Sequence, residues 1–281
     1  MNIVNFIGFD SEYEKSQMVF FGAPFDGTVS YRPGTRFAPQ SVRSESYGIE
    51  TYSPYLNLDL EDYFLCDSGD LDFPFGNKEK VLKMIEEKTE KILKDKKIPI
   101  MLGGEHLVSY GAIKAAFNQY KDLQIVHFDA HADLRDDYLD EKFSHATVIR
   151  RSWDLLGDDR IFQFGIRSGT KEEFEFGKKH TFFQPFNLNG VEKIHEIIKD
   201  KPVYLTIDLD VLDPSIFPGT GTPEAGGVTF NELLKAIHSL KGLNIVGADL
   251  VELSPQYDPS GVSTAVTCKL VREVALTILN K

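Results

Sequence analysis

Hydrophobic positions along the chain fall into short continuous runs, separated by longer segments with helical periodicity. Apolar runs typical of buried β-strands lie near 18–23, 63–67, 98–102, 123–129, 160–166, 180–184, 202–208 and 244–250. Helical patterns lie near 78–95, 107–119, 190–199, 230–240 and 263–279. In the last of these helices, Val266, Leu270, Val274 and Ile278 form one apolar face.

Strands that alternate with helices favour a mostly parallel sheet covered by helices on both faces. We therefore expect an α/β fold, a three-layer α/β/α sandwich with roughly eight strands in its central sheet. A length of 281 residues suits one large domain, and the sequence contains no repeat or linker, so we expect residues 1–281 to form a single domain. Ligands of such sheets bind beyond the carboxyl ends of the strands.

Composition and charge narrow the possible partners. With 31 basic and 43 acidic residues the formal net charge is −12, which disfavours nucleic acid and anionic membrane surfaces and favours a small cationic substrate. No apolar run approaches the length of a membrane helix, and the first residues lack the pattern of a secretory signal. Cys66 and Cys268 have neither metal-ligand spacing nor a disulfide framework. We therefore expect a cytoplasmic protein.

Candidate metal ligands follow two of the predicted strands. The sequence reads Asp-Ala-His-Ala-Asp at 129–133 and Asp-Leu-Asp at 208–210. Alternate residues of an extended strand point the same way, so Asp129 and His131 can share one site, as can the two acids of the second run. Carboxylates in one pocket repel each other and are costly to desolvate, and divalent cations remove both penalties. The pattern therefore predicts a two-metal centre.

A third motif, Gly-Gly-Glu-His at 103–106, follows another apolar run. Its glycines allow a tight turn at the end of the strand, and His106 then opens the next helical pattern. Such a histidine is usually structural when it stands alone, but beside the two aspartate runs it becomes a candidate ligand. His127 shares the strand face of Asp129 but lies one step deeper in the sheet, so we expect it to pack beside the centre.

Together these motifs resemble the ureohydrolase family, which includes arginases and agmatinases. The resemblance covers nearly the whole chain, from Phe-Gly-Ala-Pro at 21–24 to Val-Glu-Leu-Ser-Pro at 251–255, and includes the long stretch 206–227, which is rich in Gly and Pro. Four motifs occur in the family's order, which makes the resemblance specific. It implies an arginase-like fold and an enzyme that hydrolyses a guanidino C–N bond.

The resemblance further implies two Mn²⁺ ions in each subunit. The first would be held by His106, Asp129, Asp133 and Asp208, and the second by Asp129, His131, Asp208 and Asp210. This oxygen-rich set suits Mn²⁺ better than a thiolate-seeking ion. A hydroxide that bridges the two ions would attack the guanidinium carbon, and the products would be urea and an amine.

Catalytic and substrate-binding roles also come from the resemblance. Glu252 matches the glutamate that binds the guanidinium group, and Thr222 is expected to form a hydrogen bond near it. Asp133 would orient the hydroxide and pass a proton to the leaving amine, and His145 matches the histidine assigned to proton transfer. Ala146 stands where glycine more often follows this histidine, so the backbone conformation there is an open question.

The residues after the ligand motifs favour the agmatinase branch. Leu-Arg-Asp-Asp-Tyr-Leu-Asp at 134–140 and Gly-Ile-Arg-Ser-Gly-Thr at 165–170 stand in place of the groups with which arginases bind the α-carboxylate and α-amino groups of arginine. An acidic loop suits the distal ammonium group of agmatine, and the candidates to bind it are Asp136, Asp137 and Glu224. We expect hydrolysis of agmatine to putrescine and urea, in polyamine biosynthesis, by a homotrimer or homohexamer like those of the family.

Two alternatives stay open. The chain could be another guanidino or formimino hydrolase, such as an arginase or a guanidinobutyrase, and Arg135 is the obvious partner for the carboxylate of guanidinobutyrate. It could also be a metal-binding regulatory protein without turnover. The complete set of six ligands, together with Glu252 and His145, argues against this second alternative.

Overall fold

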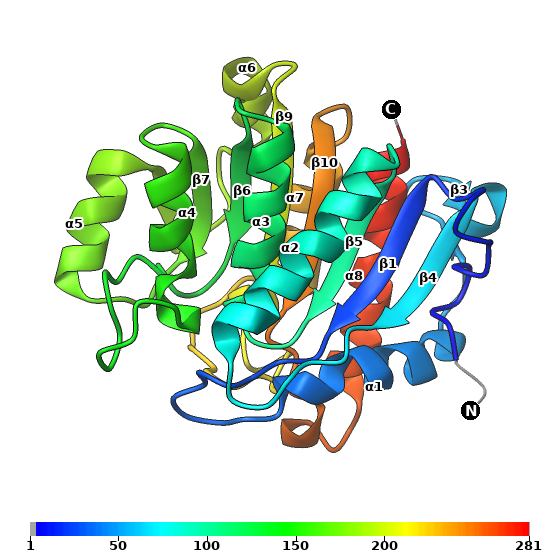
Figure 1. Ribbon diagram of the computed structural model, residues 1–281, viewed down its shortest axis with the longest axis horizontal. Coiled ribbons are helices and arrows are strands. Elements are labelled where there is room, and N and C mark those ends of the chain that lie inside the picture. The colour runs from blue at the N-terminus through cyan, green and yellow to red at the C-terminus, as the bar shows by residue number, and fades with distance from the viewer. Residues whose placement is uncertain (1–3, 281) are drawn as a thin grey trace.

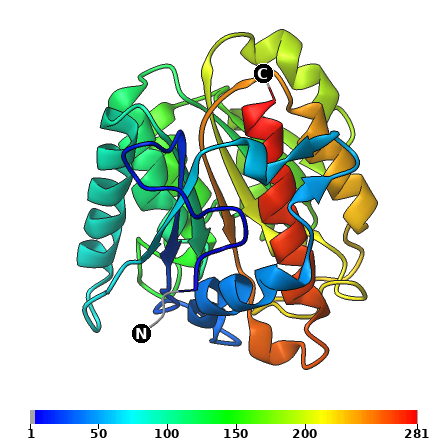
Figure 2. The ribbon, with the colours of Figure 1, turned by 90° about the vertical axis from the view of Figure 1, so that its right-hand side faces the viewer.

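A computed structural model describes residues 4–280 and shows a sheet between two layers of helices (Figure 1 and Figure 2). The sheet contains β1 (Met18–Ala23), β4 (Leu65–Asp70), β5 (Ile98–Gly103), β6 (Gln124–Phe128), β7 (Ile161–Ile166), β8 (Phe182–Pro185), β9 (Pro202–Asp208) and β10 (Asn244–Val251). The α-helices are α1 (Ala38–Glu45), α2 (Lys78–Lys94), α3 (Val108–Gln119), α4 (Val148–Leu156), α5 (Lys171–His180), α6 (Ile194–Ile198), α7 (Phe230–Ser239) and α8 (Val262–Leu279).

Within residues 4–280 the sheet has eight strands in the order β4-β1-β5-β10-β9-β6-β7-β8, and its strand pairs are parallel. The last two strands in the chain, β9 and β10, lie in the middle of the sheet, between β5 and β6. A small antiparallel hairpin of β2 (Tyr52–Ser53) and β3 (Leu58–Asp59) lies outside this sheet. The four central strands therefore bring distant parts of the sequence together at one edge.

Each face of the sheet has its own hydrophobic core. Strand residues such as Phe20 and Val126 join α1, α7 and α8 on one face. Their chain neighbours Phe21 and Ile125 join α2, α3 and α4 on the other face. Adjacent residues of a strand point to opposite faces, so strands that are apolar throughout fit a sheet covered on both sides.

The fold class predicted from the sequence is confirmed, and the eight strands lie within a few residues of the predicted runs. Three helices, α1, α4 and α5, were not among the predicted elements. Helix α5 reads Lys-Glu-Glu-Phe-Glu-Phe-Gly-Lys-Lys-His, a mostly charged segment that gives little helical periodicity. Its start is instead fixed by a capping box, in which Thr170 and Glu173 bond each other's backbone N–H groups.

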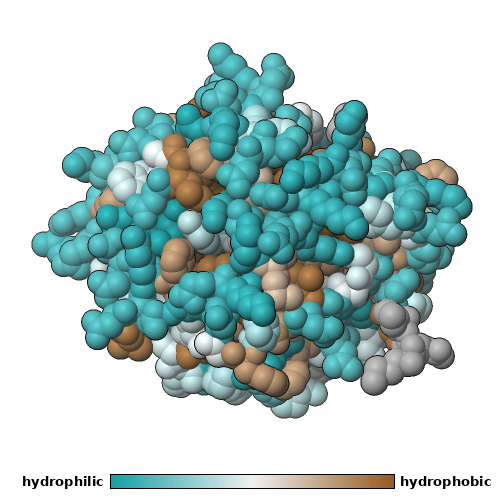
Figure 3. Space-filling view, viewed as in Figure 1, coloured by the Kyte–Doolittle hydropathy of each residue, from teal (hydrophilic) through white to brown (hydrophobic). Residues whose placement is uncertain are grey.

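The surface seen in Figure 3 is mainly hydrophilic, with small and separate hydrophobic patches. Across residues 4–280, the structure contains no helix that combines the length and the apolar character needed to cross a membrane.

Candidate metal centre

The candidate ligands meet at the carboxyl ends of the four central strands. His106 follows β5, the run 129–133 follows β6, Asp208 ends β9 with Asp210 just beyond it, and Glu252 follows β10. The strand order reverses here. From β6 the chain continues outward through β7 to β8 at one edge of the sheet, and it then forms β9 and β10 between β6 and β5. Parallel sheets bind their ligands at such reversal points.

The first ligand group surrounds one imidazole nitrogen. Nδ1 of His106 lies 3.1 Å from Oδ2 of Asp129, 3.1 Å from Oδ2 of Asp133 and 3.2 Å from Oδ2 of Asp208. This nitrogen is buried and has no hydrogen-bond partner among the residues that the structure describes. Three carboxylate oxygens and one nitrogen that point at a common position form a donor set that fits a divalent cation.

A second ligand group lies beside the first. Nδ1 of His131 lies 2.9 Å from Oδ2 of Asp210 and 3.6 Å from Oδ1 of Asp129. The two oxygens of Asp129 thus face different histidines, which is the placement that a carboxylate bridging two ions requires. All six predicted ligands are brought together at this end of the sheet.

The electrostatics of the centre also favour bound cations. Burial, with the nearby carboxylates of Asp210 and Asp129, raises the pKa of Asp208 well above its usual value. Burial and the Asp129 carboxylate likewise raise the pKa of Asp133 to about 7. Closely spaced buried carboxylates resist ionisation, and divalent cations relieve this cost.

The orientation of His106 is fixed by residues that the sequence analysis did not select. Its Nε2 lies 3.0 Å from Oγ1 of Thr206, and this hydroxyl donates a 2.6 Å hydrogen bond to Oδ1 of Asp249. Because the only hydroxyl proton of Thr206 is given to Asp249, its oxygen accepts from Nε2–H of His106, which leaves Nδ1 free as a ligand. Tyr204 donates to the other oxygen of Asp249 at 2.8 Å. Tyr204, Thr206 and Asp208 are alternate residues of β9 and therefore share one face of the strand. This spacing is a sequence signal from which Tyr204 and Thr206 could have been selected.

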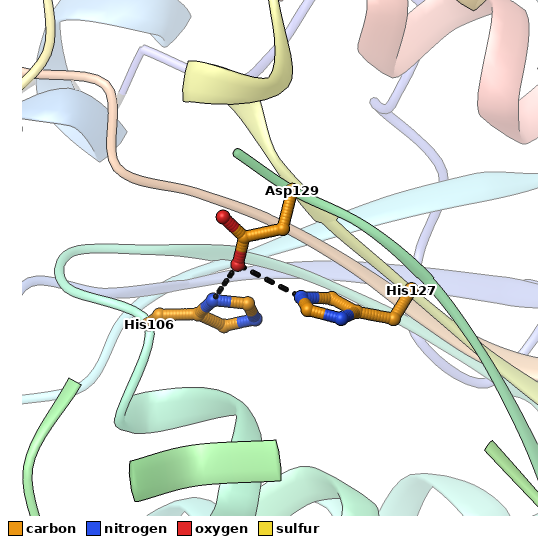
Figure 4. A group of neighbouring side chains, drawn as sticks. All are labelled: His106, His127 and Asp129. Atoms are coloured by element: carbon orange, nitrogen blue, oxygen red, sulfur yellow. Dashed lines mark hydrogen bonds and ion pairs between the residues drawn. The ribbon is translucent and has the colours of Figure 1, made fainter. Parts of the chain in front are cut away.

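His127 lies beside Asp129 but faces it as a hydrogen-bond donor. Figure 4 shows one carboxylate oxygen of Asp129 joined to the imidazoles of both His106 and His127. Nε2 of His127 is 2.8 Å from Oδ2 of Asp129, and its Nδ1 is 3.2 Å from the side-chain amide nitrogen of Gln163. Since that amide donates to Nδ1, the proton of His127 is on Nε2 and is given to Asp129. This arrangement agrees with the expectation that His127 packs beside the centre.

A cavity of about 240 Å³ opens over the ligands. Its lining includes Glu252, Thr222 and His145, all three predicted from the sequence. Glu252 is buried, and its Oε1 accepts a 2.8 Å hydrogen bond from the backbone N–H of His106. Glu252 and Asp133 both have left-handed backbone conformations, with φ of 68° and 54°. Strained conformations of this kind are concentrated at functional sites.

His145 lies in a short 3₁₀ helix (His145–Thr147) at the side of the cavity. Ala146, at the centre of this turn, is not among the described residues with positive φ, so no glycine is required there. Burial lowers the pKa of His145 to about 4, which keeps its imidazole neutral at pH 7. A neutral imidazole can accept a proton, and a low pKa lets it release that proton readily.

The three acids proposed for the distal ammonium do not reach the cavity. Asp136 is exposed and pairs with Arg151 at 2.7 Å, and Asp137 is also exposed. These two and Glu224 are absent from the cavity lining formed by the described residues. The acid that does line it, apart from Glu252 and the metal ligands, is Glu173.

Glu173 was not selected from the sequence, because it reads as an ordinary acid at the start of a helix. Its carboxylate is buried, accepts from the backbone N–H of Leu134 at 3.0 Å, and lies 3.4 Å from Nε of Arg135. Arg135 stacks over the ring of Tyr138, with 4.6 Å between the guanidinium carbon and the ring centroid. Arg135 and Tyr138 also line the cavity.

Arg167, at the end of β7, braces the loop that carries Asp210 and Thr222. Its guanidinium donates to the carbonyl oxygens of Asp210 at 2.8 Å, Val211 at 3.1 Å and Glu224 at 2.7 Å. These bonds hold two parts of the loop together, 210–211 and 224, beside the candidate centre. An arginine whose partners are backbone carbonyl groups leaves no sequence signal, because any residue type can supply them.

Comparison with known proteins agrees with this geometry. The family model described as "Arginase family" matches residues 16–277. The chain is 47% identical to the agmatinase of Bacillus subtilis over 275 residues, which cover 96% of this chain and 95% of the relative. It is 48% identical to the agmatinase of Bacillus anthracis over 276 residues, with the same coverage. The crystal structure of agmatine ureohydrolase from Thermoplasma volcanium superposes with a TM-score of 0.91 at 35% identity, covering 100% of this chain and 96% of that one. The chain therefore belongs to the arginase family.

Proposed function

We propose that the chain hydrolyses agmatine to putrescine and urea, with two Mn²⁺ ions held by the six clustered histidine and aspartate side chains. The observation that carries the proposal is a cavity whose floor is the ligand cluster and whose wall contains Glu252. It is supported by the similarity to agmatinases along almost the entire chain. When bound, the two ions would lower the pKa of a water molecule and so supply a nucleophile at neutral pH.

Glu252 is proposed to bind the guanidinium group. One of its oxygens is held by the backbone of His106, which fixes the carboxylate at the cavity wall beside the ligands. Burial raises the pKa of Glu252 well above its usual value, so a cationic partner is needed to keep it ionised. A guanidinium group offers both the charge and a planar set of donors that matches a carboxylate. Thr222, whose hydroxyl is 3.3 Å from Oδ2 of Asp210, is proposed to contact the same group.

Asp133 and His145 are proposed to move protons during the reaction. Asp133 lies at the cavity surface beside His106 and is placed to accept a proton from the attacking nucleophile. The same carboxyl group can then give this proton to the leaving amine. His145, neutral at pH 7, is proposed to carry protons between the cavity and solvent.

In the lining of the cavity, Glu173 replaces Asp136, Asp137 and Glu224 as our candidate for binding the distal ammonium of agmatine. It is a buried carboxylate in the lining. The primary ammonium of agmatine, at the end away from the guanidinium, needs such an anionic partner.

A second candidate function is hydrolysis of guanidinobutyrate, because Arg135 also lines the cavity and could bind a carboxylate. We favour the diamine-forming reaction, because the chain is 47% and 48% identical to two agmatinases along almost its entire length.

The experiment that tests the proposal measures urea released by the Mn²⁺-loaded protein from agmatine, arginine and guanidinobutyrate, side by side. We expect a clear preference for agmatine. The Glu252→Gln variant should keep its metal content and lose most of this activity, since its neutral amide no longer attracts the guanidinium group. Equal or better turnover of arginine or guanidinobutyrate would contradict the choice of substrate.

We further propose that residues 1–281 act as one catalytic domain, that the protein assembles as a homotrimer or homohexamer, and that it works in the cytoplasm in polyamine biosynthesis. The buried, unpaired thiols of Cys66 and Cys268 suit a reducing compartment. Analytical ultracentrifugation measures the subunit number directly, and cell fractionation tests the compartment.

A further inference from the structure

The loop after β1 runs against the turn that carries His106, although some 80 positions separate them in the chain. The backbone N–H groups of Gly104 and Glu105 donate to the carbonyl oxygens of Ala23 at 2.9 Å and Phe25 at 2.8 Å. A Cβ atom on Gly104 would lie only 2.0 Å from the Phe25 oxygen, so this close contact requires glycine. The loop is thus firmly attached to the β5–α3 turn.

Beyond this attachment, Thr28 is held by both oxygens of the Glu105 carboxylate. Its backbone N–H donates to Oε2 of Glu105 at 2.7 Å, and its hydroxyl donates to Oε1 at 2.6 Å. Glu105 is completely buried. A buried carboxylate must be satisfied by such bonds, so the position of Thr28 is well determined.

From this fixed position, Thr28 contacts His145 in a different loop. The backbone N–H of His145 donates to Oγ1 of Thr28 at 3.1 Å. The hydroxyl proton of Thr28 is already given to Glu105, so its oxygen is free to accept. Two residues on, Oγ of Ser30 lies 3.4 Å from Nε2 of His145 and lines the cavity. The loop after β1 therefore contacts both the backbone and the ring of this histidine.

We infer that Thr28 is a positioning residue for His145, holding its backbone where the imidazole reaches the substrate cavity, with Ser30 acting on the ring. The inference rests on the proposed function, because His145 is the proton carrier there. Nothing else among the described residues bonds the side chain of His145, whose Nδ1 is buried without a partner. Rates of proton transfer depend steeply on such placement.

Thr28→Val tests the inference, since valine keeps the shape and removes the hydroxyl. We expect kcat for agmatine to fall about tenfold, with KM and bound metal within about twofold of the parent protein. Thr28→Ser, which keeps the hydroxyl, should restore the rate. Thr35→Val is the matched control, because Thr35 begins the short 3₁₀ helix (Thr35–Phe37) that follows the same loop and its buried hydroxyl bonds none of the described residues.

The decisive measurement repeats Thr28→Val in a His145→Ala background. If Thr28 acts only through His145, removing its hydroxyl should have no further effect there. The kcat of the double variant should stay within about twofold of the kcat of His145→Ala. Equal losses in both backgrounds would overturn the inference, as would an unchanged rate for Thr28→Val. Ser30→Ala, at an exposed position, should cause a smaller loss that also vanishes in this background.

Amide hydrogen exchange separates this inference from the proposed function. Thr28→Val should speed exchange across residues 144–147, whereas Thr28→Ser and Thr35→Val should not. If the parent protein released no urea from any guanidino compound, the proposed function would fail, and faster exchange would still support the structural link. Unchanged exchange in Thr28→Val would overturn that link whatever the substrate.

Discussion

Replacing Thr206 by valine should weaken metal binding although Thr206 is not a ligand. Thr206 accepts the Nε2 proton of His106 and donates its own proton to Asp249. Without the hydroxyl, nothing holds the proton of His106 on Nε2, and the imidazole loses the bond that keeps Nδ1 directed at Asp129, Asp133 and Asp208. Outer hydrogen bonds of this kind are worth about 10–100-fold in metal affinity.

The loss corresponds to about 1.4–2.7 kcal/mol of binding free energy. Asp249 also loses one of the two hydrogen bonds that it accepts from side chains of β9 and keeps the 2.8 Å bond from Tyr204. A buried carboxylate that loses a hydrogen bond costs a further ~1–3 kcal/mol of folding stability. For a protein of this size, each kcal/mol lowers Tm by about 2–4 °C.

Competition between the protein and a fluorescent Mn²⁺ chelator measures the affinity, and calorimetry measures Tm. Thr206→Ser should behave like the parent protein in both assays. Thr89→Val is the control for the chemical change itself, because Thr89 is buried in α2 and its hydroxyl bonds none of the residues described. If Thr206→Val bound Mn²⁺ within twofold of the parent protein, the role given to this hydrogen bond would be refuted.

Two further predictions concern the cavity lining and the loop beside the centre. Glu173→Gln should raise KM for agmatine about tenfold and change kcat little, because the distal ammonium is remote from the bond that breaks. Steady-state kinetics measures both constants. An unchanged KM would show that Glu173 does not bind the substrate. Asp213 accepts hydrogen bonds from the side chain and backbone of Ser215 and from the backbone of Gly226 and Gly227, which lower its pKa to about 2. This stabilisation is present above pH ~4 and is lost as the pH falls towards 2, so Asp213→Asn should cost about 1 kcal/mol at pH 7, after allowance for solvent screening, and almost nothing at pH 2. Urea denaturation at the two pH values checks the sign, and a cost that grew at low pH would contradict it.

The clustering of the six candidate ligands could be predicted from the sequence because their geometry is local. Alternation along a strand places Asp129 beside His131 and Asp208 beside Asp210, and parallel strands bring such ends to one edge of the sheet. The same reasoning found the eight strands, whose buried runs are nearly continuous. It missed helix α5, where a charged sequence hides the helical period and a capping box sets the start.

Residues that act through tertiary contacts could not be selected in this way. Thr28 touches His145 across 117 positions of the chain, and Thr206 touches His106 across 100. The direction of a loop side chain is equally hidden: Asp136 stands close to the ligands in the sequence but turns away to Arg151, while Glu173 enters the cavity from a helix start. Charge in a loop shows that an acid is available, and only packing decides where it points.

The order of strands in the sheet has a consequence for biosynthesis. Two of the six candidate ligands lie at the end of β9 or just after it, and Glu252 follows β10. The ribosome makes these two strands after the other six strands of the sheet, and they insert between β5 and β6. A nascent chain that ends before β9 offers the two histidines and the aspartates of 129–133, without the carboxylates of Asp208 and Asp210 that lie beside those histidines. High-affinity loading with metal should therefore wait until β9 and β10 have emerged and inserted between β5 and β6.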